Sequence, residues 1–184
     1  MSISIGKSCI VKYNIDKVLG KKETMFFDWL KTDMISINQI FNVDNLNGIL
    51  LLEDSNNPYH NGKSRILIKS LSYCESVHDI PVNYNSFNII NFIEKYKKRY
   101  NKIVEAIKNC NSTIYFLRKG SIFLEEKNQF IKNIKRINPN CQFKLVELLE
   151  HNEKNNYQKI EDNFISINLD NYLIKKKLQI GLVI

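Results

Sequence analysis

The chain has 184 residues and a mass of 21.7 kDa, which is the size of a single domain. Hydrophobic residues make up 43% of it and charged residues 25%, so a largely disordered protein is excluded. The net charge is +8, but lysine outnumbers arginine 23 to 4, and the chain also holds 27 Ile and 25 Asn, a bias that AT-rich codons produce. The basic charge therefore gives little support to a nucleic-acid function, because nucleic-acid binders rely more on arginine.

The sequence shows no membrane-spanning segment, no secretory signal and no metal-binding cysteine pattern. The sequence has no run of about 18 apolar residues, and its start, MSISIG, lacks the basic and long apolar regions of a secretory signal. The four cysteines, at positions 9, 74, 110 and 141, match no zinc pattern and no compact disulfide framework. We therefore expect a cytoplasmic protein with free thiols and with no membrane association, metal or cofactor.

The chain begins with a short apolar run, Ser2 to Ile5, which predicts a strand that Gly6 ends. Apolar residues then recur at helical spacing from Ile10 to Leu19, and Gly20 is a typical C-terminal stop. Cys9 is therefore predicted to lie in the turn between a strand and the first turn of a helix.

The region from residue 25 to residue 80 is predicted to hold short elements. An aromatic segment, Met25 to Leu30, precedes a short helix at 34–43. Strands are expected at 49–52, 66–68 and 71–77, with turn signals at Asn56-Asn57-Pro58 and Asn61-Gly62. Residues 45–80 could form an antiparallel insertion.

Strands and helices alternate after residue 85. The pattern predicts helices at 87–109 and 125–137 and strands at 113–117, 142–148 and 164–169, although 145–149 could instead continue as helix. Such alternation is typical of βαβ units. We therefore expect one α/β domain over residues 1–184, with a mainly parallel sheet and helices on both of its faces.

Cys9 is the strongest candidate for chemistry. A thiol at a helix N-terminus lies at the positive end of the helix dipole, which favours the thiolate. Backbone N–H groups beside it could form an oxyanion hole. The alternative is a small buried apolar residue at a tight turn.

A nucleophilic cysteine needs a general base, and histidine is the usual one. The candidates are His60, His78 and His151. His60 and His151 lie in polar segments, and we expect both to be exposed. His78 follows an alternating apolar run, and the end of a strand is a stiff platform for a base. The alternative for His78 is a surface or capping residue.

Two aspartates could orient such a base. Asp79 follows His78 directly, and it could reach the imidazole only if the chain bends there, because neighbouring side chains on a strand point to opposite faces. Asp28 lies within the aromatic segment, so we expect it to be partly buried and paired. It could orient the histidine or bind a backbone turn, and we expect it to be the more structural of the two.

Five short segments carry more weight together, in this order and spacing, than any of them does alone. They are Ser4-Ile-Gly-Lys-Ser-Cys9, Phe27-Asp-Trp29, His78-Asp79, Tyr96-Lys-Lys-Arg99 and Phe116-Leu-Arg118. Together they resemble a family of papain-like cysteine peptidases of bacteria and large DNA viruses, over residues 3 to 120. Lys7-Ser8 and Lys98-Arg99 depart from the family's commoner residues, but neither departure removes a proposed catalytic group.

The resemblance implies that Cys9 is the nucleophile and His78 its base, with Asp79 or Asp28 orienting the imidazole. We therefore expect a thiol-dependent hydrolase or acyl-transferring enzyme with a protein or peptide substrate. A viral origin would suit the AT-rich composition, and such a protein would act in the host cytoplasm.

The alternative is a non-catalytic protein that binds a host protein or a nucleic acid. Basic residues cluster at 95–102, 132–136 and 175–177, and Tyr96 and Tyr100 in the first cluster could stack on bases. These tyrosines fall on the apolar face of the predicted helix. We therefore expect them in the core, and we expect no specific nucleic-acid binding.

Overall fold

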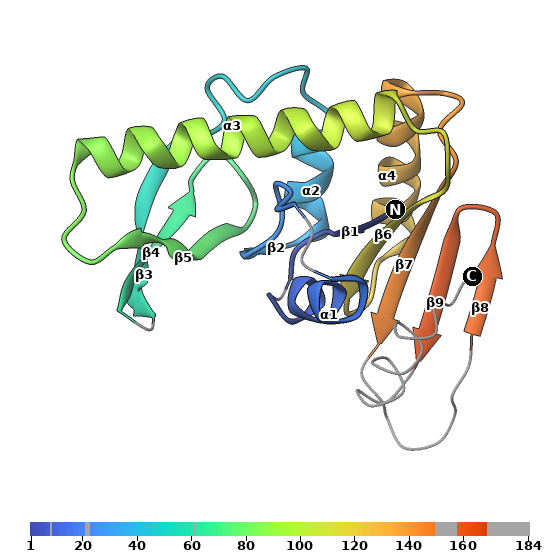
Figure 1. Ribbon diagram of the computed structural model, residues 1–184, viewed down its shortest axis with the longest axis horizontal. Helices are drawn as coiled ribbons and strands as arrows, with labels where there is room; N and C mark the ends of the chain where they lie inside the picture. The colour runs from blue at the N-terminus through green and yellow to red at the C-terminus, as the bar shows by residue number, and fades with distance from the viewer. Residues whose placement is uncertain (8, 21–22, 61, 150–157, 169–184) are drawn as a thin grey trace.

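The computed structural model describes residues 1–7, 9–20, 23–60, 62–149 and 158–168. For residues 9–10, 18–19, 56–60, 158–161 and 166–168 the description is of the backbone only. Within these ranges the chain forms two sheets and four helices, so the predicted α/β class is confirmed (Figure 1). His151 and the basic run 175–177 lie outside the described residues.

The first sheet, sheet A, is mainly parallel, as the sequence predicts. Its order is β1 (Ser2–Ser4), β6 (Ile114–Lys119), β7 (Phe143–Leu149), β9 (Phe164–Asn168) and β8 (Gln158–Glu161). The first four strands run parallel, and β8 returns antiparallel beside β9. The sequence pattern did not predict β8, and the segment 145–149 is strand, not helix.

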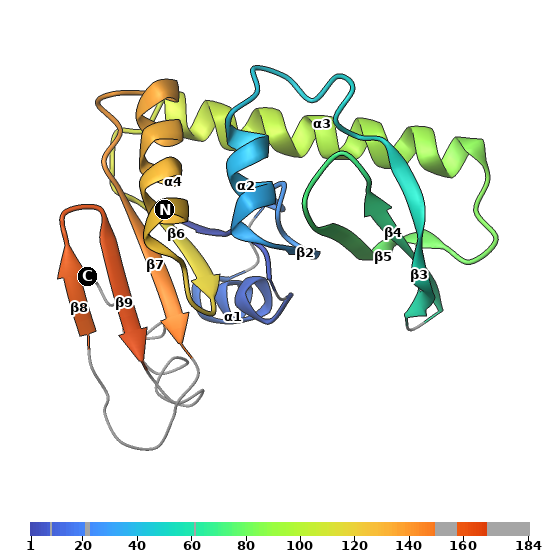
Figure 2. The ribbon, with the colours of Figure 1, turned by 180° about the vertical axis from the view of Figure 1, so that it is seen from behind.

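Helices cover both faces of sheet A. On one face, Val11 of α1 (Cys9–Leu19) packs in an apolar cluster with Leu117 and Val146. Neighbouring side chains of the same strands point to the opposite face, where Phe116 meets Phe130 of α4 (Leu124–Ile137), with ring centroids 5.1 Å apart. The helix α2 (Met34–Phe41) lies beside α4 on that face, which Figure 2 shows from behind.

The second sheet, sheet B, is antiparallel and includes the region predicted as an insertion. Its order is β2 (Leu30–Thr32), β5 (Cys74–Pro81), β4 (Lys63–Ile68) and β3 (Leu52–His60). The predicted turn at Asn56-Asn57-Pro58 is wrong, because β3 runs through it with an irregular register between Asp54 and Tyr59. Proline is tolerated there because β3 is an edge strand, which leaves one row of backbone groups unpaired.

The longest helix, α3 (Ser86–Lys108), runs across sheet B and reaches α4 beside sheet A (Figure 1). Asn85 caps it by accepting a hydrogen bond from the N–H of Asn88. Its apolar face includes Tyr96 and Tyr100, which are 0% and 3% exposed. The prediction that these tyrosines belong to the core is confirmed. In the described part of the chain, none of the helices is both long enough and apolar enough to cross a membrane.

Candidate active site

The turn after β1 brings Cys9 to the carboxyl edge of sheet A. Gly6 and Lys7 have φ values of 75° and 63°, in the left-handed region, and α1 then begins at Cys9. A Cβ atom on Gly6 would lie 1.6 Å from Oγ1 of Thr32, so only glycine fits in this turn. Functional groups of open parallel sheets gather at this edge. The backbone of Cys9 thus starts a helix directly after a strand, as predicted. Because the structure describes only the backbone of Cys9, the predicted distance from its sulfur to His78 stays a prediction.

His78 lies in a bulge of β5. The register between β4 and β5 shifts between Ser64 and Ile66, so residues 77–79 of β5 stand opposite a single residue of β4. A bulge bends the strand and changes the direction of its side chains. The half-buried ring of His78 meets the ring of Trp29 edge-on, with centroids 5.9 Å apart. His78 is thus held within a strand that continues to Pro81, not at a strand end as the sequence suggested.

The carboxylate of Asp79 faces α3. It accepts hydrogen bonds from Lys95, from the hydroxyl of Tyr96 and, at 3.3 Å, from Ser76. Burial raises the pKa of Asp79, but the hydrogen bonds from Lys95 and Tyr96 outweigh this and hold the pKa below its usual value of 3.8. None of these partners is the imidazole of His78. In the described structure, Asp79 therefore anchors the bulge to α3.

Asp28 is buried and paired, as its aromatic surroundings predict. Its Oδ2 accepts the N–H of Met25 at 2.8 Å and lies 3.4 Å from Nζ of Lys12 in α1. Its Oδ1 has no hydrogen-bond partner in the described part of the chain. Burial raises the pKa of Asp28 to about 6, although the backbone bond and the charge of Lys12 both lower it. Its polar partners are therefore on α1 and in its own turn, and not on His78.

An arginine from α3 pairs with Asp79 and also influences Asp28. Nη1 of Arg99 is 3.8 Å from Oδ2 of Asp79, and its Cζ lies 4.9 Å from the ring centroid of Tyr96. Its positive charge also lowers the pKa of Asp28, as a smaller influence than burial and Lys12. The segments Phe27-Asp-Trp29, His78-Asp79 and Tyr96-Lys-Lys-Arg99, which are far apart in the sequence, thus meet in the folded chain.

A second arginine joins the two sheets. Arg118, at the end of β6, is 5% exposed and donates hydrogen bonds to the carbonyls of Ile5 and Thr32, both at 3.1 Å. Ile5 extends β1 of sheet A, and Thr32 ends β2 of sheet B. Burial lowers the pKa of Arg118. Arg118 therefore fixes sheet B, which carries His78, against the strand that leads to Cys9.

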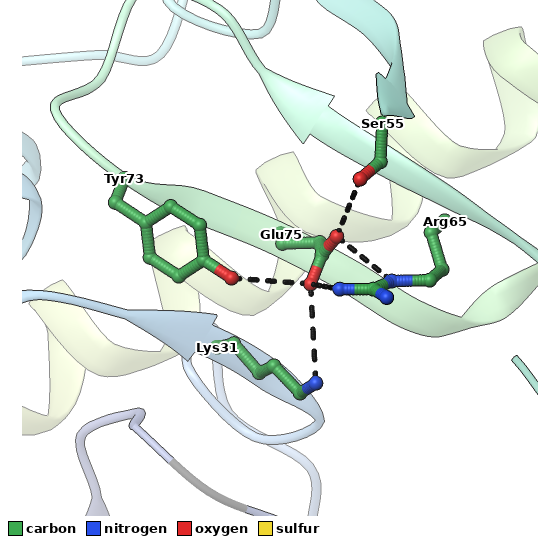
Figure 3. Close-up of polar contacts among 5 residues, drawn as sticks. All are labelled: Lys31, Ser55, Arg65, Tyr73 and Glu75. Atoms are coloured by element: carbon green, nitrogen blue, oxygen red, sulfur yellow. Dashed lines mark hydrogen bonds and ion pairs between the residues drawn. The ribbon is translucent and has the colours of Figure 1, made fainter. Parts of the chain in front are cut away.

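A polar cluster on sheet B was not predicted from the sequence. Glu75 of β5 lies at its centre (Figure 3). Only 1% of Glu75 is exposed. Arg65 donates to both carboxylate oxygens, at 2.9 and 2.6 Å, and the hydroxyls of Ser55 and Tyr73 donate at 2.9 and 3.2 Å. Nζ of Lys31 lies 4.0 Å away. Burial raises the pKa of Glu75, but the hydrogen bonds from Arg65 and Ser55 outweigh this and lower it overall.

This Glu75 cluster links all four strands of sheet B, since Lys31, Ser55 and Arg65 lie on β2, β3 and β4. The alternation of buried and less buried residues over Lys63–Ile68 puts Arg65 on the outer face of β4, and the alternating sequence is the one signal that could have indicated this. Only the strand register, which the sequence does not reveal, brings Arg65 diagonally across from Glu75. The cluster holds together the sheet on which His78 lies.

The arrangement offers no evident metal site. In the part of the chain that the structure describes, no group of three or more His, Cys, Asp or Glu side chains could hold a metal ion. At this place the backbone of Cys9 begins α1, and His78 lies on the adjoining sheet, where its ring contacts Trp29.

Comparisons with known proteins agree with the resemblance seen in the sequence. The family model described as "Putative papain-like cysteine peptidase (DUF1796)" matches residues 1–155 of 184. No curated protein and no solved structure matches the chain.

Proposed function

Because the chain belongs to the family described as putative papain-like cysteine peptidases, we propose that it is a thiol-dependent hydrolase of amide or peptide bonds. Cys9 is the proposed nucleophile and His78 the proposed general base. The observation that carries the proposal is the start of α1 at Cys9, directly after a strand of a parallel sheet. A thiolate is favoured at this position because the helix dipole and unpaired backbone N–H groups stabilise negative charge.

In the proposed reaction His78 takes the thiol proton of Cys9, and the sulfur attacks the carbonyl carbon of the substrate. The tetrahedral intermediate forms a thioester when the amine leaves, and the imidazolium of His78 gives the amine its proton. A water molecule, deprotonated by His78, then attacks the thioester, which releases the acid and restores the thiol. In this proposal the backbone N–H groups at the start of α1 stabilise the oxyanion.

The two aspartates are assigned supporting roles in this proposal. Asp79 fixes the bulge that presents His78, since its carboxylate is bonded to α3. Asp28 fixes the segment that carries Trp29, the residue whose ring contacts His78.

The direct test is alkylation of the native protein by iodoacetamide at pH 6, read by mass spectrometry of each cysteine. A thiolate at Cys9 reacts, and His78→Ala slows the reaction. Burial raises the pKa values of Cys74 and Cys141, so neither reacts under these conditions, and the half-buried Cys110 is the internal reference. If Cys9 reacts no faster than Cys110, the hydrolase proposal fails, and the hypothesis of a non-catalytic binding protein is favoured.

A second measurement tests acyl transfer. With p-nitrophenyl acetate, one equivalent of nitrophenolate is released in a burst as the thioester forms, followed by slower turnover. Cys9→Ser abolishes the burst. A burst that survives this substitution would locate the nucleophile elsewhere.

Partners and location are part of the same proposal. A protein or peptide substrate in the cytoplasm fits the free thiols of Cys74, Cys110 and Cys141. Specific nucleic-acid binding is not proposed, because several basic side chains already pair within the chain. These pairs are Lys95 and Arg99 with Asp79, Lys102 with Glu23, and Arg136 with Asp44.

A further inference from the structure

Lys12 is a buried lysine that the proposed reaction does not use. It lies on α1 three residues after Cys9, less than one helical turn along the chain. Only 3% of Lys12 is exposed. Its ammonium group lies 2.9 Å from Oδ1 of Asp16 and donates to the carbonyl of Glu23 at 3.2 Å. A lysine buried this deeply is retained only where it is paired.

Lys12 also contacts the segment that carries Trp29. Its Nζ lies 3.4 Å from Oδ2 of Asp28, which is 1% exposed and also holds the N–H of Met25. Asp28 directly precedes Trp29, and the ring of Trp29 contacts the ring of His78. A short series of contacts thus connects the helix that begins with Cys9 to the imidazole.

A buried ion pair is a poor source of stability, because removing two charges from water costs about as much as their attraction returns. Such a pair does fix geometry, since each charge must stay within reach of the other. Of the described charges nearby, Asp16 lies on α1 itself and Arg99 lies on α3, so neither of these two links α1 to the segment from Met25 to Trp29.

We propose that Lys12 and Asp28 form a positioning pair. They hold the first turn of α1 against the segment from Met25 to Trp29 and so set the approach of the Cys9 thiol to the His78 ring. This inference rests on the proposed thiol hydrolase function. Lys12 and Asp28 are positioning residues that act through Cys9 and His78.

The sign of the charge provides a sharp test. Lys12→Met removes a positive charge and Asp28→Ala removes a negative one. If the pair acted only through its electric field, the two changes would shift the reactivity of Cys9 in opposite directions. A positioning pair predicts the same direction: at about pH 7.5, where Asp28 is ionised, each variant slows alkylation of Cys9 by about tenfold or more, as the thiol loses its imidazole partner.

Two further lysine variants serve as controls for this experiment. Lys12→Arg keeps the charge and restores most of the rate. Lys17→Met removes an exposed lysine from the last turn of the same helix and leaves the rate unchanged. If Asp28→Ala does not fold, Asp28→Asn removes the same charge with less change of shape. Opposite shifts, or no change in both Lys12→Met and the Asp28 variant, would overturn the proposal.

Hydrogen exchange separates failure of the pair from failure of the proposed function. Wild-type Cys9 that does not react at pH 6 would refute the hydrolase but would leave the anchoring role to be measured directly. Lys12→Met then lowers the protection of the α1 amides from Tyr13 to Asp16 at least several-fold, and Lys17→Met does not. Equal protection in Lys12→Met and Lys17→Met would refute the positioning role of Lys12, regardless of how fast Cys9 is alkylated.

Discussion

Tyr96 donates its buried phenolic hydrogen to the carboxylate of Asp79, and this bond joins α3 to the bulge of β5 that holds His78. Asp79 is also bonded to Lys95 and Ser76, whereas Asp28 is bonded to Met25 and paired with Lys12. The sequence led us to expect Asp28 to be the more structural of the two aspartates. The contacts in the structure favour the opposite order as a prediction, because a buried carboxylate with more donors is costlier to remove.

Asp79→Ala should therefore lower the free energy of unfolding at pH 7 by about 1.5–3 kcal/mol, the usual worth of hydrogen bonds to a charged group. Because folding lowers the pKa of Asp79, its contribution is present above pH 3.8 and is lost as the pH falls through its folded pKa. Urea unfolding between pH 2.5 and about 7 checks this. A difference between wild type and variant that stays constant with pH would contradict it.

Asp28→Asn should show the opposite pH dependence. Folding raises the pKa of Asp28 from 3.8 to about 6, so its contribution is present below pH 3.8 and is lost as the pH rises through 6. A shift of this size corresponds to about 3 kcal/mol. The variant cannot ionise, so its stability relative to wild type should rise by up to this amount between pH 4 and pH 7. Lys12→Met removes a charge that lowers the pKa of Asp28. In a Lys12→Met background, the gain in stability from Asp28→Asn should therefore continue to higher pH.

Gly6→Ala should disturb the turn that leads to Cys9. The φ of 75° disfavours alanine, and the added Cβ would lie 1.6 Å from Oγ1 of Thr32. We expect a loss of at least about 1–3 kcal/mol, the cost of a strained backbone, together with slower alkylation of Cys9. Gly48→Ala is the matched control, because its φ is 81° but no atom lies within 4 Å of the added Cβ. Equal melting temperatures for the two variants would show that the contact with Thr32 is unimportant.

Glu75→Gln should destabilise sheet B, because it removes the charge that two donors of Arg65 hold. We expect a loss of about 1.5–3 kcal/mol for this charged, buried arrangement. Lys69→Met is the control, since its pairing with Glu53 is exposed and worth about 0–1 kcal/mol. Chemical denaturation of both variants checks the order. A loss for Glu75→Gln no larger than for Lys69→Met would mean that the cluster does not hold the strands together.

Nucleic-acid binding should be weak and non-specific. The charge of +8 attracts phosphates at low salt, and this attraction should vanish near physiological salt because it depends on counterion release. Labelled single- and double-stranded oligonucleotides, titrated at about 150 mM salt, provide the measurement. Micromolar or tighter binding that weakens in a Lys97→Ala, Lys98→Ala double variant would favour the binding-protein alternative.

The sequence by itself determined the elements with strong local signals. The 3.6-residue spacing in 87–109 and 125–137 predicted α3 and α4, since a helix buries one face regardless of its partner. Gly6 between an apolar strand and a helical pattern from Ile10 predicted that a helix begins beside Cys9, because glycine reaches positive φ without strain, and α1 begins at Cys9 itself. The resemblance then identified the family that the comparison shows.

Only the tertiary structure decided how the motifs meet. Pairing partners made β2 a strand and carried β3 through Asn56-Asn57-Pro58, against the local turn signals. The two-residue shift of register in β5 turned Asp79 toward α3, and strand register brought Arg65 to Glu75. The pairing of Lys12 with Asp28 could not be predicted either, because contacts between residues distant in sequence depend on how the chain packs, and no local pattern encodes that packing.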